Sequence, residues 1–430
     1  MKTVVVIGGG TSGMMAALSA AEQGHRVVLL ERQQRLGRKL LATGDGRCNL
    51  TNTAASPAHY HGAEADFVRP ALETFGVEAT LAFFHELGLL TVEEYGGRVY
   101  PLSNSANSVL DVLRFALDRA GVEQRCGCSA REIRRREQGY SVLTDAGPLE
   151  ADALIVACGG CAGGKLGGVT DGYNLLKPLG HKRTGLYPSL VQLLTAPELP
   201  RALKGVRCPA RLRLRAGESL LAASEGELQF TETGVSGPAV FDLSRAAATG
   251  GEGLTLHIDF LGRSEEETLA LLRQRRTAFP DLETGEILTG MLHNRLGRML
   301  VRQAGLNAAL PLRALGQSDL DKLAAVLLDL KLPVRGTEDF DHAQVTAGGV
   351  KTGGFNPETL ESWFVPGLFV CGEVLDVDAD CGGYNLQWAW SIGHLAVRLG
   401  AWSGSVICAW SPARRRAFCG SGPPESCASR

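Results

Sequence analysis

The chain has 430 residues, of which 44% are hydrophobic and 21% are charged, and its formal net charge is -2. This length exceeds the usual size of a single domain, so at least two hydrophobic cores are expected. The near-neutral charge provides no broad positive field, which argues against a nucleic-acid backbone or an anionic membrane as partner.

The sequence gives no sign of export or membrane insertion. No apolar stretch approaches the ~20 residues of a membrane-spanning helix, and "MKTVVVI" is too short for a signal peptide. The 11 cysteines are odd in number and scattered through apolar segments. We therefore expect a cytoplasmic protein with reduced thiols and no membrane contact.

The first predicted elements form a strand, a helix and a second strand. Residues 4–7 predict a buried parallel strand, residues 16–24 a helix with glycine just past its end, and "RVVLLE" the second strand. Gly8, Gly10 and Gly13 form a GxGxxG turn between the first strand and the helix. Their missing side chains allow a tight turn, a close approach to a pyrophosphate and close helix packing, so the spacing predicts a bound dinucleotide.

Two polar residues complete this predicted nucleotide site. Ser12 adds a hydroxyl donor for the diphosphate beside the positive end of the helix. Glu31 ends the second strand about 20 residues after the glycines, where a carboxylate accepts hydrogen bonds from a ribose diol. That carboxylate would repel a 2′-phosphate, so NADP is disfavoured at this turn.

The next segment, "ERQQRLGRKLLATGDGRCNLTN", combines glycines with basic residues. A solvated loop is one interpretation, but the glycines and the Asn-Leu-Thr-Asn run beside the charges favour a binding loop. We predict that Arg38, Lys39 and Arg47 face phosphates, and we include Asn49 in the site.

The sequence resembles the BaiN-like flavoproteins, also called aminoacetone oxidase family FAD-binding enzymes. The matching blocks run from Val4 to Gly393 and include "VVVIGGGTSGMMAA", "GRKLLATGDGRCNLTN", "GRVYPLS", "DALIVACGG", "FTETGVSGPAVFDLSR" and "GLFVCGEVLDVDADCGGYNLQWAWSIG". The resemblance implies FAD as cofactor and an α/β fold of the glutathione-reductase type. In that fold a split, Rossmann-like FAD-binding domain carries an inserted β-barrel-like domain and a helical subdomain.

The resemblance also implies that distant segments return to the same cofactor. Glu373, at the carboxyl end of a predicted strand, would accept hydrogen bonds from the ribityl hydroxyls. The helix that follows Gly383 would direct its amides toward the pyrimidine edge of the flavin and stabilise negative charge there. The further predicted FAD contacts lie at strand ends, in loops and at this helix start, and they are Ala130, Gly159, Gly372, Glu373, Gly383, Tyr384, Asn385 and Leu386.

Changes in sequence pattern predict the domain boundaries. Short segments of alternating apolar and polar residues predict antiparallel strands up to about residue 260. A region of predicted helices follows, with Ser264 as N-cap and Glu267 as its capping-box partner. We predict a discontinuous FAD domain over residues 1–190 and 343–403, a β-rich substrate domain over 191–262 and 331–342, a helical insert over 263–330, and a disordered tail over 404–430.

The sequence also contains cysteines that could take part in redox chemistry or metal binding. Cys158 and Cys161 spell CxxC, and a redox dithiol beside the flavin is an alternative to a purely structural strand end. A zinc site that adds Cys126 and Cys128 would need poor ligand spacing, so no metal is predicted. Relatives tend to carry Thr at position 158 and His at position 232, where this chain has Cys and Glu.

No catalytic triad or acid–base residue emerges from the sequence. His342 and three aromatic residues, Tyr187, Tyr384 and Trp388, are candidates to lie near the flavin, with ordinary packing as the alternative. No second GxGxxG follows a strand, so no tightly held NAD(P) is expected, although NAD(P)H stays open as a transient donor.

These observations predict an FAD-dependent oxidoreductase. It would transfer hydride between the flavin and a small organic substrate of the amine or enone class, in either direction. An FAD-dependent tRNA-modifying protein and a non-catalytic flavin-binding sensor are the alternatives. The charge balance argues against the RNA alternative, so we predict no nucleic-acid partner.

Overall fold

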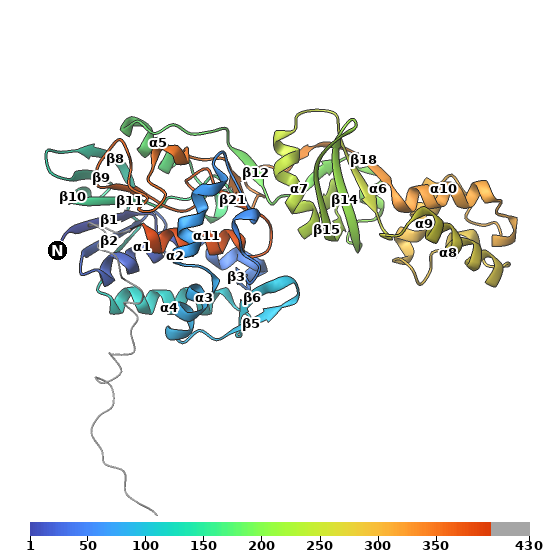
Figure 1. The fold of residues 1–430 in the computed structure, drawn as a ribbon, viewed down its shortest axis with the longest axis horizontal. Coiled ribbons are helices and arrows are strands. Elements are labelled where there is room, and N and C mark those ends of the chain that lie inside the picture. Colours follow the sequence, from blue (N-terminus) through green and yellow to red (C-terminus); the bar gives the residue numbers. More distant parts are fainter. Residues whose placement is uncertain (397–430) are drawn as a thin grey trace, which may run out of the picture. The chain divides into compact units, whose positions relative to one another are not determined.

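The computed structural model describes residues 1–396, and its first layer is a five-stranded parallel sheet in the order β20-β11-β1-β2-β7 (Figure 1). These strands are β1 (Thr3–Ile7), β2 (Arg26–Glu31), β7 (Glu123–Cys126), β11 (Ala153–Val156) and β20 (Leu368–Val370). The β-branched residues of β1 are buried on both faces, as expected for the centre of a parallel sheet. The predicted strand–helix–strand unit is therefore present, with α1 (Thr11–Glu22) between β1 and β2.

Helix α11 (Tyr384–Leu395), from the end of the described chain, packs against α1. Smaller elements surround this pair and the sheet. The other helices of this region are α2 (Arg69–Thr74), α3 (Val77–Glu86), α4 (Ala106–Arg119) and α5 (Asp171–Leu176). The smaller sheets are β3 (Thr51–Asn52), β6 (Arg98–Pro101) and β5 (Thr91–Glu94); β8 (Ala130–Arg135), β9 (Tyr140–Thr144) and β10 (Gly147–Ala151); β12 (Tyr187–Ser189) and β19 (Val345–Ala347); β4 (Tyr60–His61) and β21 (Asp378–Ala379).

A closed six-stranded barrel follows in the chain, and its strands pair antiparallel in the order β13-β16-β15-β14-β17-β18. The strands are β13 (Leu193–Thr195), β14 (Arg207–Ala216), β15 (Ser219–Phe230), β16 (Gly234–Ser236), β17 (Leu254–Asp259) and β18 (Leu330–Thr337). Buried and exposed residues alternate along β14 and β17, so one face of each strand fills the barrel interior. Helix α6 (Glu198–Ala202) precedes β14, and α7 (Pro238–Thr249) lies between β16 and β17.

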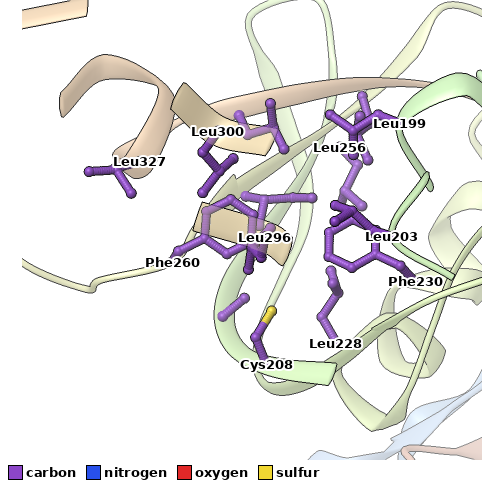
Figure 2. Close-up of a cluster of buried hydrophobic side chains, with 14 of the residues drawn as sticks. Leu199, Leu203, Cys208, Leu228, Phe230, Leu256, Phe260, Leu296, Leu300 and Leu327 are labelled. Carbon is purple, nitrogen blue, oxygen red and sulfur yellow. The ribbon is translucent and has the colours of Figure 1, made fainter. Parts of the chain in front are cut away.

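Three helices occupy the connection between β17 and β18. They are α8 (Glu265–Ala278), α9 (Asn294–Gln303) and α10 (Gln317–Leu328). The predicted capping box at the start of α8 is present, since Ser264 Oγ accepts the Glu267 amide at 3.1 Å and Glu267 accepts the Ser264 amide at 2.9 Å. Figure 2 shows Leu296 and Leu300 from α9 and Leu327 from α10 in one cluster with barrel side chains such as Leu256.

The predicted fold class is confirmed, because a Rossmann-type sheet, a barrel and a helical segment are all present. The predicted domain boundaries stay a prediction, and the predicted disordered tail lies outside the described residues. Within residues 1–396, none of the helices has both the length and the apolar character needed to cross a bilayer.

The shared cluster predicts that the helices stabilise the barrel. Leu296→Ala removes a fully buried side chain from this cluster and should lower the free energy of unfolding by about 2–5 kcal/mol. Urea denaturation followed by circular dichroism measures the change. Leu310→Ala is the matched control, because Leu310 is 44% exposed, and an equal loss in both variants would contradict the prediction.

Candidate functional site

A cavity of about 830 Å³ extends from the carboxyl ends of β1, β2 and β11 to the amino end of α11. Parallel sheets bind ligands at this edge because the strand ends leave free backbone groups there. Most of the sequence-predicted site residues line the cavity, and they are Gly8, Gly10, Ser12, Glu31, Arg38, Lys39, Arg47, Asn49, Ala130, Gly159, Glu373, Gly383, Asn385 and Leu386.

The three glycines of the first turn differ in their surroundings. A Cβ on Gly8 would overlap the Ala157 carbonyl, and one on Gly13 would overlap the Gly8 carbonyl. A Cβ on Gly10, in contrast, would meet no protein atom within 4 Å. Gly8 and Gly13 therefore serve the packing of the turn, whereas Gly10 leaves open space on the cavity side.

Gly13, Gly372 and Tyr384 do not line the cavity, although the sequence predicted all three as cofactor contacts. A Cβ on Gly372 would overlap the Ser12 side chain, so Gly372, like Gly13, allows close backbone packing. The Tyr384 ring stacks on His59 with ring centroids 4.1 Å apart, and its carbonyl accepts the Tyr60 hydroxyl at 3.1 Å. The Tyr384 ring is thus engaged by His59 rather than by the cavity lining.

Glu31 is held by the backbone that it faces. One carboxylate oxygen accepts the Gly9 amide at 2.8 Å, and the other accepts the Gln33 amide at 2.7 Å. The carboxylate thereby closes the end of the glycine turn. Each oxygen keeps a further lone pair for a ligand hydroxyl.

The basic residues of the loop after β2 have partners within the protein. Lys39 Nζ lies 3.0 Å from Glu373 Oε2, and Glu373 Oε1 accepts the Thr346 amide at 2.9 Å. Arg38 donates to Gln33 at 3.0 Å.

The guanidinium of Arg47 pairs with Glu94, donates to Asn104 and lies 4.0 Å from the centre of the Tyr100 ring. Sequence reasoning predicted that Arg47 faces a phosphate. The structure adds that Glu94, which belongs to β5, already neutralises its charge.

The amino end of α11 forms the other end of the cavity. Gly383 caps this helix with a φ of 102°, and a Cβ there would lie 2.6 Å from the Thr51 carbonyl. The Asn385 side chain bonds the Ala379 amide and carbonyl at 3.0 and 2.8 Å, which fixes the preceding loop.

Two buried polar atoms beside this helix end have no hydrogen-bond partner among the described residues. They are Asn49 Oδ1 and Trp388 Nε1, and both residues line the cavity. Such atoms are costly to bury unless a ligand or water satisfies them.

Residues from the barrel strands and from the start of α7 complete the cavity lining. They are Arg207, Glu227, Gln229, Ser236, Gly237, Pro238 and Phe241. Next to Phe241, Asp242 accepts the Cys381 amide at 2.7 Å, and burial raises the pKa of its carboxyl to about 6. Sequence reasoning missed these residues.

Sequence reasoning also missed Arg98 and Tyr100 in the lining. Their two-residue spacing within "GRVYPLS" is typical of one face of a strand and was the available signal.

Within the described part of the chain, the cysteine and metal-ligand candidates do not form a reactive site. Burial raises the pKa of the Cys158 thiol to about 12 and also raises that of Cys161, so neither favours the thiolate that dithiol chemistry needs. Within residues 1–396, no group of three His, Cys, Asp or Glu side chains is arranged to hold a metal.

Of the other candidates, His342 and Trp388 line the cavity, whereas Tyr187 and Glu232, like Tyr384, do not. His342 lies in the lining but is exposed and bonds Asp339 at 2.9 Å; Trp388 also lines the cavity. Tyr187 and Glu232 do not, and Glu232 forms an exposed pair with Lys204 at 2.7 Å.

Comparison with known protein families identifies the family of this chain. The model described as "HI0933-like protein Rossmann domain" matches residues 2–399. The chain belongs to the HI0933-like family. The predicted resemblance and the predicted cofactor are thereby confirmed: this HI0933-like protein is an FAD-dependent oxidoreductase.

Curated relatives cover nearly the whole chain. The 3-dehydro-bile acid delta(4,6)-reductase of Clostridium scindens is 38% identical over 413 residues, which are 93% of this chain and 99% of the relative. The ribosomal RNA dihydrouridine synthase of Escherichia coli is 31% identical over 90% of this chain and 95% of the relative. The synthase of the same name from Haemophilus influenzae is 28% identical over 91% of this chain and 96% of the relative.

The buried Asp242 predicts a pH-dependent stability. Its pKa is raised in the folded state, so between about pH 4 and 6 the folded protein holds a proton that the unfolded chain has released. Stability therefore falls as pH rises through this window, and Asp242→Asn removes that fall. Between pH 4 and about pH 7.5, the unfolding free energy of D242N relative to wild type should rise by up to about 3 kcal/mol.

Urea denaturation of D242N and wild type at the two pH values measures this change. Asp321→Asn changes an exposed carboxylate and serves as the control, which should follow the wild-type pH dependence. A D242N curve parallel to that of wild type would show that the Asp242 carboxyl does not titrate in this window.

Proposed function

We propose that FAD lies along the cavity, with its diphosphate at the glycine turn and its flavin at the amino end of α11. One continuous cavity joins these two ends, and it supports this placement. The residues present fit such a ligand: Gly10 leaves open space at the turn, and Asn49 Oδ1 lacks a partner at the opposite end. The amides at the starts of α1 and α11 supply positive ends for the diphosphate and the flavin.

We assign the predicted site residues to parts of this ligand. Ser12 and the Gly10 backbone face the diphosphate, Glu31 accepts from the ribose diol, and Lys39 with Glu373 faces the ribityl chain and phosphates. These assignments are supported by the presence of all five residues in the cavity lining. Lys39 and Glu373 compensate each other at 3.0 Å, so the pair presents both a donor and an acceptor without a net charge.

The proposed reaction is the reduction of a carbon–carbon double bond that is conjugated to a carbonyl group in a small organic molecule. The named activities of the relatives agree on this chemistry, because a delta(4,6)-reductase of a 3-dehydro compound and a dihydrouridine synthase both saturate such a bond. Bound FAD supplies the hydride, and a nicotinamide dinucleotide is the proposed transient donor. Pro238 and Phe241, from the start of α7, provide an apolar wall on this side of the cavity.

A steroid-like enone is the first candidate substrate, since the most identical of the relatives reported above reduces a bile acid. Uridine in ribosomal RNA is the second candidate, because two relatives with this activity cover at least 90% of the chain. The net charge of -2 favours the small molecule, as RNA binding rests on phosphate contacts from a basic surface.

Stopped-flow spectroscopy separates these candidates. The purified flavoprotein is reduced anaerobically with NADH or NADPH, and a 3-keto-4-ene steroid is then added. Reoxidation of the flavin with formation of the saturated ketone is the expected result. Failure with the enone, together with dihydrouridine formation in ribosomal RNA, would establish the second candidate, and reduction of the oxidised flavin by amines would favour an amine oxidase.

The open space at Gly10 predicts a variant that folds but binds FAD weakly. Gly10→Ala introduces a methyl group where no protein atom lies within 4 Å, at a φ of -78° that alanine adopts freely. The thermal stability of the apoprotein should be unchanged, while the Kd for FAD should rise by at least about 10-fold, because the methyl group occupies space needed by the diphosphate.

Gly316→Ala is the matched control, since Gly316 also caps a helix with extended backbone (φ -80°, ψ 175°) but lies outside the cavity lining. FAD titration by fluorescence quenching measures both variants. Equal FAD affinity in G10A and wild type would contradict the placement of the diphosphate at this turn.

A further inference from the structure

Arg98 is a half-buried cation in the cavity wall. Its guanidinium has no hydrogen-bond or ion-pair partner among residues 1–396. The other half-buried lysine and arginine of the lining are compensated, Lys39 by Glu373 and Arg47 by Glu94. Removing a charge from water without a partner costs free energy. An uncompensated guanidinium in a cavity is therefore a position where a ligand oxygen is expected.

The strand that carries Arg98 directs it into the cavity. In β6, residues 98 and 100 both line the cavity, whereas Val99 between them is 3% exposed and belongs to the core. This alternation is the normal side-chain pattern of a strand. β6 pairs with β3 on one side, where Asn52 lies opposite Arg98, and with β5 on the other.

Arg98 also lies beside the start of α11. The side-chain amide nitrogen of Asn52, Nδ2, donates to the Gly382 carbonyl at 2.9 Å. This bond fixes the turn before the helix against β3 and β6. A Cβ on Gly382 would lie 3.7 Å from Arg98 Nε. The guanidinium and the positive helix end thus reinforce each other at one place in the cavity.

The nearby acid does not neutralise this charge. Asp242 belongs to α7 and accepts the Cys381 amide, but it forms no ion pair within 4.0 Å of Arg98. Arg98 nevertheless lowers the pKa of Asp242, which is raised mainly by burial. The cation therefore acts through space on this end of the cavity while its donors stay free.

We propose that Arg98 binds the carbonyl oxygen of the substrate and stabilises the negative charge that this oxygen gains during reduction. This inference rests on the proposed function. Bound, reduced FAD would supply the hydride that adds to the β-carbon of the conjugated system, and the electron pair of the double bond would move to the carbonyl oxygen. Arg98 donates hydrogen bonds to the resulting enolate oxygen, and a proton from solvent then adds to the α-carbon.

The test uses pentafluorophenol, whose anionic oxygen on a flat ring imitates the enolate. Titration into the oxidised holoprotein should produce a long-wavelength charge-transfer band with the flavin. Arg98→Met should raise the Kd of this complex about 10- to 100-fold, the effect of losing a charged hydrogen bond. Arg98→Lys should recover part of the affinity, and Arg119→Met, which removes an exposed arginine outside the cavity lining, should leave it unchanged.

A carbonyl oxygen of the flavin is the alternative hydrogen-bond acceptor for Arg98. The reduction potential of the flavin distinguishes this acceptor from the substrate oxygen. If Arg98 binds the substrate oxygen, the flavin midpoint potential of R98M stays at the wild-type value while phenolate affinity falls. A lower potential with unchanged phenolate affinity would overturn the proposal in favour of the flavin. Equal phenolate affinity and potential in R98M and wild type would also overturn it.

The same titration separates this inference from the proposed reaction. A wild-type holoprotein that binds phenolate through Arg98 but reduces no enone would contradict the proposed function alone. Enone reduction that is equally fast in R98M and wild type, with unchanged phenolate binding, would contradict the role of Arg98 alone.

Discussion

The close approach of three backbone segments around the first turn of α1 is the constraint on which the rest of the site depends. Gly13 packs against the Gly8 carbonyl, and Gly372 packs against the Ser12 side chain. A Cβ on Gly393 in α11 would lie 2.5 Å from the Ser12 carbonyl. Any larger residue at these contacts would push α1 or α11 outward and separate the two ends of the cavity.

This packing brings both paired and unpaired basic side chains into one cavity. The pairs Lys39–Glu373 and Arg47–Glu94 are internally balanced and so contribute polar groups at little cost in net charge. Arg98 stays uncompensated at the opposite end. Relatives that match more than nine-tenths of their own length to this chain are named for two different substrates, a bile acid and ribosomal RNA, so overall similarity in this family does not by itself specify the substrate.

The sequence predicted the parts of this protein that depend on local pattern. The β-branched strand, the GxGxxG turn and the Ser264 capping box each depend on neighbours within a few residues, and all are present. Local pattern does not reveal the contacts of the Tyr384 ring and the Arg47 guanidinium, because their partners His59 and Glu94 come from other parts of the chain. The sequence does not single out Arg98, because only the three-dimensional arrangement shows which basic side chains have an ion-pair partner.

The contact between Ser12 and Gly393 joins residues that are far apart in the sequence, and it sets an order of events during synthesis. The amino-terminal turn emerges from the ribosome first, yet its packing surface is absent until α11 has been translated. Long-range pairing of this kind slows folding, and the exposed apolar face of α1 must be protected meanwhile. The cavity that lies between the glycine turn and the start of α11 is therefore complete only after α11 has been translated.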